Sequence, residues 1–95
     1  MPIYIQLIRW TDKGRADVAT LPDRAEAVVR RIEEHGAKIH GNYMTMGQYD
    51  QVAIVEAPDD MTVAKLSMII AGRGNAVTET LRAFTMDEVR TALEA

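Results

Sequence analysis

The chain of 95 residues contains no cysteine. Without cysteine there is no disulfide, no thiol nucleophile and no zinc site built from thiolates. Nothing in the sequence therefore requires an oxidising compartment.

The chain also lacks blocks of like charge and long apolar runs. Its net charge of -3 and its pI near 5.3 arise from interspersed acidic and basic residues, without a basic stripe. This pattern argues against nucleic acid or an anionic membrane as a partner. The chain starts with a strand pattern and has no basic region followed by a long apolar run. We therefore expect neither a signal peptide nor a membrane span, and a cytoplasmic location.

What the chain does contain is 47% hydrophobic and 26% charged residues, the balance of one globular domain over residues 1–95. A domain of this length has a small core, so burial against a partner subunit would add stability. Only one tryptophan is present, at Trp10.

Hydrophobic periodicity and turn residues predict the order βαββαβ followed by a short helix. Thr20 is the expected cap of the first long helix, which ends at Gly36. An aspartate after Pro58 caps the second helix, and Thr85 with Glu88 forms a capping box for the last one. The strands are predicted at residues 2–10, 37–46, 49–57 and 76–84, and the helices at residues 20–35, 61–72 and 86–93.

This order is typical of a ferredoxin-like α+β fold, in which both helices cover one face of a four-stranded antiparallel sheet. We expect aliphatic side chains of the first and third strands to lie under the helices, namely Ile3, Ile5, Leu7, Val52 and Ile54. The helix-free face would then carry Tyr4, Gln6, Ile8, Trp10, His40, Asn42, Met44, Ala53, Val55, Thr78, Thr80 and Arg82. Such an apolar face is rarely left exposed to solvent in a monomer, so a second subunit is expected to cover it.

One short motif lies between the second and third strands. Gly47, Tyr49 and Asp50 follow one another in a Gly-x-Tyr-Asp turn, and Pro-Asp-Asp stands at 58–60. With "TETLRAF" at 78–84, these residues resemble the GYD domain family along nearly the whole chain. The resemblance implies a dimeric α/β barrel built from ferredoxin-like units. It brings no catalytic residue set, because the family has no assigned biochemical function.

The residues of the motif are also explained by a turn. Gly47 with Gln48 fits a two-residue hairpin loop that needs a positive φ, Tyr49 can bury its ring, and Asp50 can accept hydrogen bonds from backbone amides. The alternative is that Tyr49 and Asp50 line the mouth of a pocket.

The candidate site lies between the sheets of the expected dimer. We predict a ligand-binding group of Tyr4, Trp10, His40, Asn42 and Tyr43. Among them, His40 is the candidate for acid–base catalysis because imidazole titrates near neutrality. A hydrogen-bonded histidine in the interface explains the same residue. No closely spaced set of ligands predicts a metal, and no dinucleotide motif predicts a cofactor.

Two classes of function follow. The first is a self-associating, non-catalytic module that binds a small aromatic molecule between its sheets. The second is a monooxygenase-like enzyme without metal or cofactor, acting on an aromatic substrate through Trp10, His40 and Asn42. The second rests on analogy of fold alone.

Overall fold

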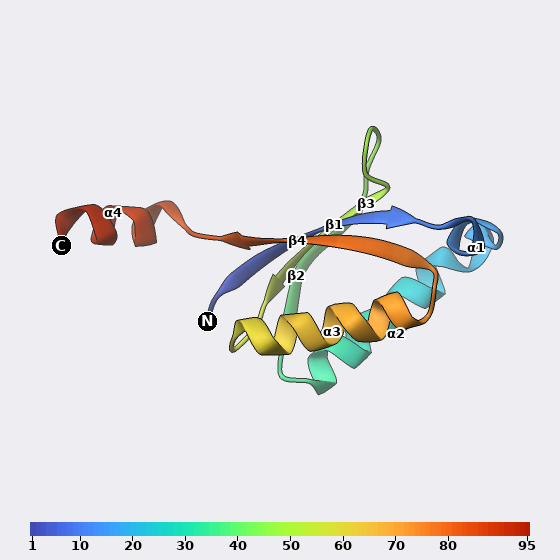
Figure 1. Ribbon diagram of the computed structural model, residues 1–95, viewed down its shortest axis with the longest axis horizontal. Helices are drawn as coiled ribbons and strands as arrows, with labels where there is room; N and C mark the ends of the chain where they lie inside the picture. The colour runs from blue at the N-terminus through green and yellow to red at the C-terminus, as the bar shows by residue number, and fades with distance from the viewer.

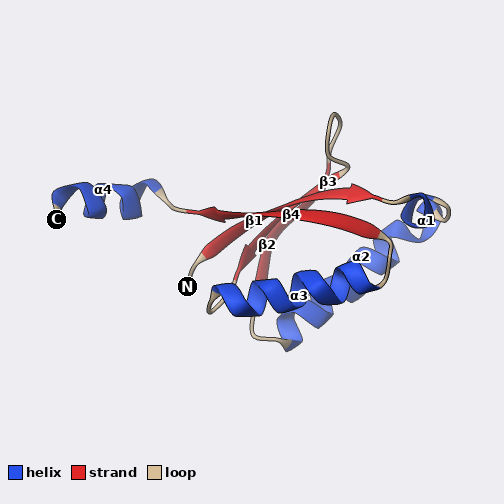
Figure 2. Cartoon of the chain, in the orientation of Figure 1, coloured by secondary structure: helices blue, strands red, loops and turns tan.

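The computed structural model describes all residues from Met1 to Ala95 as one four-stranded antiparallel sheet with helices (Figures 1 and 2). The strand order is β2-β3-β1-β4, and every neighbouring pair is antiparallel. The predicted α+β class is confirmed, and so is the order of the four strands, the two long helices and the last helix. The elements are β1 (Ile3–Trp10), α1 (Asp12–Arg15), a 3-10 helix (Val18–Thr20), α2 (Leu21–Glu34), β2 (Lys38–Met44), β3 (Gln51–Glu56), α3 (Asp60–Gly72), β4 (Ala76–Ala83) and α4 (Met86–Glu94).

The helix ends follow the predicted caps at two of three positions. Asp59 accepts a hydrogen bond from the Thr62 amide at 2.8 Å, which starts α3. Thr85 and Glu88 form the predicted capping box of α4. Thr20 precedes α2 as predicted, but its hydroxyl donates to the Asp17 carbonyl instead of capping the helix. Asp17 lies in the turn between α1 and the 3-10 helix, two short segments that the sequence did not predict.

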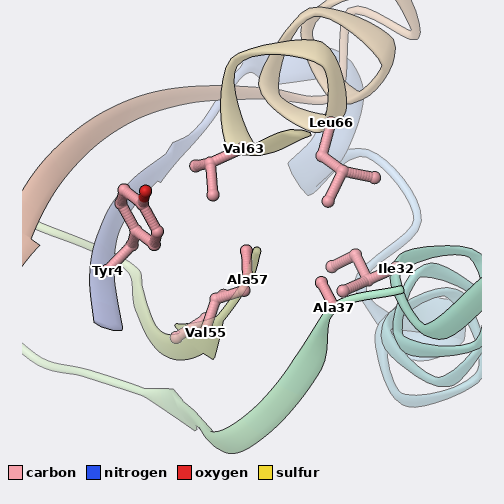
Figure 3. Close-up of a cluster of buried hydrophobic side chains, with 8 residues drawn as sticks. Tyr4, Ile32, Ala37, Val55, Ala57, Val63 and Leu66 are labelled. Carbon is pink, nitrogen blue, oxygen red and sulfur yellow. The ribbon is translucent and has the colours of Figure 1, made fainter. Parts of the chain in front are cut away.

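Both long helices, α2 and α3, lie on the same side of the sheet (Figure 2). Tyr4 of β1 and Val55 of β3 are buried with Val63 and Leu66 of α3, and Ile32 of α2 joins the same core (Figure 3). Side chains alternate between the two faces of a strand. The face under the helices is therefore the one that carries Tyr4, Gln6, Ile8 and Trp10.

The predicted assignment of the two sheet faces is wrong: Ile3, Ile5, Leu7, Val52 and Ile54 point away from the helices. One physical reason is size, because Ala53 and Val55 are small enough for the helices to approach the sheet. The other is that α3 supplies partners for the polar groups it covers. The Tyr4 hydroxyl donates to Asp60, and the Gln6 side-chain Nε2 donates to the Ser67 hydroxyl at 3.4 Å.

The hairpin between β2 and β3 is wider than the predicted two-residue loop. β2 ends at Met44 and β3 begins at Gln51, and the Thr45 amide closes the loop by donating to the Asp50 carbonyl at 2.9 Å. Gly47 lies within this loop at φ +108°. The predicted positive φ is confirmed, although the turn is not the tight one that was expected.

The C-terminal end of the chain stands apart from the rest. After β4, α4 continues outward and lies beyond the sheet and both long helices (Figure 1). The molecule is accordingly elongated, with extents of 50 × 30 × 18 Å.

Candidate functional site

The uncovered face of the sheet is a continuous aliphatic surface. Ile5 at its centre lies opposite Ile54 of β3 and Leu81 of β4. Leu7 lies opposite Val52 in the next row. Four of these side chains are half-buried by one another, and 41% of Leu81 is exposed. No helix of the chain covers this face, so its apolar area is free for a partner.

Polar contacts border one end of this aliphatic face. The Tyr49 hydroxyl donates to a Glu79 carboxylate oxygen at 2.8 Å. This hydrogen bond, together with burial, raises the pKa of the Tyr49 hydroxyl. The Arg9 guanidinium lies 4.7 Å from the centre of the Tyr49 ring, and its Nε donates to the Gln48 carbonyl at 3.1 Å. An apolar centre with a hydrogen-bonded edge is typical of protein–protein interfaces.

Asp50 fastens the same loop to β1. Its carboxylate accepts from the Trp10 amide at 2.8 Å, and its own amide donates to the Ile8 carbonyl at 2.9 Å. Arg15 lies 3.7 Å from the carboxylate. The motif residues therefore hold the β2–β3 loop against β1 and β4, and their contacts fit the structural reading of the motif.

His40 lies on the aliphatic side of the sheet, at an irregularity in the pairing of β2 with β3. Its Nε2 is 3.5 Å from a Glu56 carboxylate oxygen. Tyr43 lies on the same face, with its ring against Gly41, where an added Cβ would come within 2.7 Å of it. His40 and Tyr43 thus belong to the uncovered face, and 60% of Tyr43 is exposed.

A cavity of about 180 Å³ opens on the other side of the sheet, between one end of its strands and the helices α2 and α3. Trp10 lines it, and the indole Nε1 donates to Gln51 at 3.0 Å. Gln51 in turn donates to Asn42 at 2.6 Å. Arg24 of α2 also lines the cavity; its Nη2 donates to the Gly14 carbonyl at 2.9 Å, while its buried Nε has no partner.

The structure does not bring the five predicted ligand-binding residues together. Trp10 and Asn42 line the cavity under the helices, whereas Tyr4 lies in the core and donates to Asp60. His40 and Tyr43 are on the opposite face. Sequence reasoning missed the cavity residues Arg24, Gly14 and Asn75 as a group. Gly14 of α1 packs so closely on the Asn75 carbonyl that a side chain at this position would clash with it, and nothing in the sequence predicted that approach.

The structure holds neither a cluster of metal ligands nor a membrane-spanning helix. No group of three or more His, Asp or Glu side chains is placed to hold a metal ion. None of the helices has both the length and the apolar character needed to cross a bilayer.

These features define an α+β protein with a split βαβ sheet, one covered face and one free aliphatic face. The model of the GYD domain family matches residues 4–93, and the chain belongs to this family. The chain is 34% identical over 90 residues to a protein from Thermus thermophilus described as "Glutamine synthetase and cystathionine beta-lyase binding protein". The match covers 94% of this chain and 95% of that relative. No solved structure matches the chain.

Proposed function

We propose that this protein is a self-associating binding module, in which the aliphatic sheet faces of two copies pack against each other and the resulting homodimer binds other proteins. The observation that carries the proposal is the free face around Ile5, Leu7 and Ile54. In water this face exposes apolar area that a second copy would bury, and a two-fold axis lets one self-complementary face serve both subunits.

The amount of exposed surface supports this pairing. The chain exposes 6365 Å², whereas a compact monomer of 10.6 kDa exposes about 5,500 Å². The excess of roughly 900 Å² includes the protruding α4 as well as the free sheet face (Figure 1), and it is of the same order as the area of about 800 Å² that each partner buries in a stable protein–protein complex.

The strand order gives the arrangement of the proposed dimer. β2 and β4 are the two edges of the sheet. If the two-fold axis runs parallel to the strands between two facing sheets, β4 of each copy lies next to β2 of its partner. The unpaired edges then meet, and the two sheets form the dimeric α/β barrel that the family resemblance implies.

The relative supports the second half of the proposal, the binding of other proteins. It is described as a protein that binds two enzymes, glutamine synthetase and cystathionine beta-lyase. By this similarity we propose a metabolic enzyme of this kind as a partner of the present chain. No cluster of catalytic groups in the structure competes with this role: His40, the acid–base candidate of the enzyme alternative, is separated by the sheet from Trp10 and Asn42.

A small aromatic ligand is the second candidate, with its place moved from between the sheets to the cavity beside Trp10. The volume of about 180 Å³ lies below the roughly 300–1,000 Å³ of ordinary ligand sites, so a single-ring compound is the appropriate size. The fluorescence of Trp10 reports on occupancy of this cavity alone, because the chain has no other tryptophan. An unchanged spectrum across such compounds would remove this candidate.

The main proposal is tested with a charge in the free face. Light scattering during gel filtration at micromolar concentration should give twice the mass of 10.6 kDa for the unmodified chain. Ile54→Asp should give the monomer mass, because a buried unpaired carboxylate costs several kcal/mol. Met68→Asp is the matched control, since Met68 is 65% exposed on α3, and it should remain a dimer.

The same three proteins then serve as baits for glutamine synthetase and, separately, cystathionine beta-lyase, each purified from the source organism. We expect the unmodified chain and Met68→Asp to retain the enzyme and Ile54→Asp to retain less, because the dimer offers two equivalent sites. A monomeric unmodified chain would refute the dimer. A dimer that binds neither enzyme named for the relative would refute the proposed partners.

A further inference from the structure

Helix α4 is the one element that packs against nothing in its own chain. Every residue from Phe84 to Ala95 is exposed, and α4 lies beyond the sheet and the long helices (Figure 1). The radius of gyration of 14.3 Å exceeds the value of about 12 Å for a compact chain of this length.

The sequence nevertheless specifies a helix here. The capping box of Thr85 and Glu88 fixes its start, and both of its hydrogen bonds measure 3.1 Å. Met86, Val89 and Leu93 recur at helical spacing and form an apolar stripe on one side. A helix of nine residues is marginal in water by itself, so a stripe of this kind needs a surface to pack on.

The strand directions in the proposed dimer place such a surface beside α4. A two-fold axis parallel to the strands preserves their directions, so β4 runs antiparallel to β2 of the partner. The last residue of β4, Ala83, then lies near the start of the partner's β2 at Lys38. α4 follows Ala83 after a two-residue connection, and it therefore emerges next to the junction between α2 and β2 of the second copy.

The charges of the two segments are complementary. α4 carries Asp87, Glu88 and Glu94 against the single base Arg90. The end of α2 and the start of β2, residues 30–44, contain three bases (Arg30, Arg31 and Lys38) and two acids (Glu33 and Glu34), which leaves one net positive charge opposite the acidic helix. Lys38 is exposed at the start of β2, where an acidic helix can approach it.

We propose that α4 is an exchanged arm, which docks its stripe of Met86, Val89 and Leu93 on the α2–β2 junction of a second copy of this chain. The inference rests on the proposed homodimer and adds the residues that lock it. Each copy gives one arm and receives one, so the dimer contains two equivalent arm contacts related by the two-fold axis. Both contacts bury surface that is exposed in the isolated chain.

Substitution on the two sides of α4 tests the docking. Val89→Asp should raise the dissociation constant of the homodimer at least about 30-fold, the scale of an interface hot spot, because it places a charge in the stripe. Thr91→Asp is the control with the same added charge on the opposite side of the helix, and it should change the constant by less than about threefold. Because α4 packs against nothing in its own chain, circular dichroism of both monomers should show an unchanged fold.

Cross-linking between copies tests the location. Because the chain has no cysteine, each introduced cysteine is the only thiol of its variant. The Met86→Cys variant is mixed with the Lys38→Cys variant, and the mixture is treated with a short bifunctional maleimide. We expect a covalent heterodimer from this pair. Met86→Cys mixed with Met68→Cys, which is 65% exposed on the outer side of α3, should give none.

The outcomes separate this inference from the proposed function. If the unmodified chain is a dimer, but Val89→Asp leaves its dissociation constant unchanged or Met86→Cys links to Met68→Cys in preference to Lys38→Cys, the exchanged arm is refuted and the sheet-to-sheet dimer stands. If the unmodified chain is a monomer, the dimer itself is refuted and the arm with it. Loss of affinity in Val89→Asp alone, together with the Lys38 cross-link, supports the arm.

Discussion

Gly47, Tyr49 and Asp50 each perform a different task in the loop between β2 and β3. Gly47 adopts a φ of +108° in open space. The Tyr49 hydroxyl donates a hydrogen bond to Glu79 of β4, and the Asp50 carboxylate accepts one from the backbone amide of Trp10 at the end of β1. The loop is thereby attached to two strands that are distant in the sequence, and each residue type is explained by its contacts.

Gly47→Ala is expected to lower the free energy of unfolding by about 1 kcal/mol, because an L side chain is strained at this φ although nothing crowds it. Gly72→Ala is the matched control. Gly72 ends α3, has open space and a φ outside the left-handed region, so alanine there should be neutral or stabilise by up to about 1 kcal/mol. Urea unfolding of the three proteins measures both changes. Equal stabilities of the two variants would contradict the role of φ at Gly47.

The two aspartates at the start of α3, Asp59 and Asp60, have different structural roles. Asp59 caps it through the Thr62 amide and hydroxyl, at 2.8 and 2.7 Å. Asp60 accepts from the Tyr4 hydroxyl and so joins the helix to β1. Burial and this hydrogen bond raise the pKa of Tyr4. The adjacent carboxylates thus start the helix and fix it to the sheet, one task each.

Asp59 also makes the stability of α3 depend on pH. The hydrogen bonds from the Thr62 hydroxyl and amide lower the pKa of its carboxyl in the folded state. A lowered pKa adds stability above the ordinary aspartate pKa of about 4, and this contribution is lost as the pH falls through the folded value. We expect the difference in Tm between the unmodified chain and Asp59→Asn to be greatest near pH 6 and to shrink on acidification.

Asparagine is the appropriate replacement because it remains a helix cap but does not titrate. Thermal unfolding of both proteins by circular dichroism from pH 6 to pH 2 measures the effect, and the difference between them isolates the contribution of Asp59. A Tm difference that stays constant over this range would show that the Asp59 charge contributes nothing to the cap.

The whole molecule has apolar residues on both faces of one sheet. One face packs on α2 and α3, and the other is free around Ile5 and Ile54. This arrangement separates two kinds of instability. A charge under the helices disrupts the fold of each chain, whereas a charge on the free face disrupts only the proposed assembly.

Ile8→Asp and Ile54→Asp are expected to differ for this reason. Ile8 packs against the core under the helices, so its replacement should unfold the chain or lower its Tm at every concentration. Ile54→Asp should leave a folded monomer whose Tm does not depend on concentration, while the Tm of the unmodified dimer rises with concentration. Calorimetry at about 5 μM and at about 500 μM measures the Tm of each protein at low and high concentration. Two variants with the same behaviour would mean that the faces do not differ in role.

The sequence by itself determined the order of the strands, the two long helices and the last helix, two of the three helix caps and the positive φ of Gly47. These are local properties, since a cap or a turn needs only its own residue types and those three or four positions away. Periodicity likewise placed every strand, because alternation shows where a strand lies and which residues share a face.

Only the tertiary structure decided which face the helices cover. β1 alternates Ile3, Ile5 and Leu7 with Tyr4, Gln6 and Ile8, and apolarity alone favours the first set as the core. The structure places the second set under the helices, because Asp60 and Ser67 of α3 accept hydrogen bonds from Tyr4 and Gln6, and Ala53 leaves room for the helices. The site residues were separated for the same reason. Because the helices cover the face opposite to the predicted one, Trp10 and Asn42 lie under them. The irregular pairing of β2 with β3 places His40 on the uncovered face. Both results depend on contacts between distant parts of the chain, which a local sequence pattern does not contain.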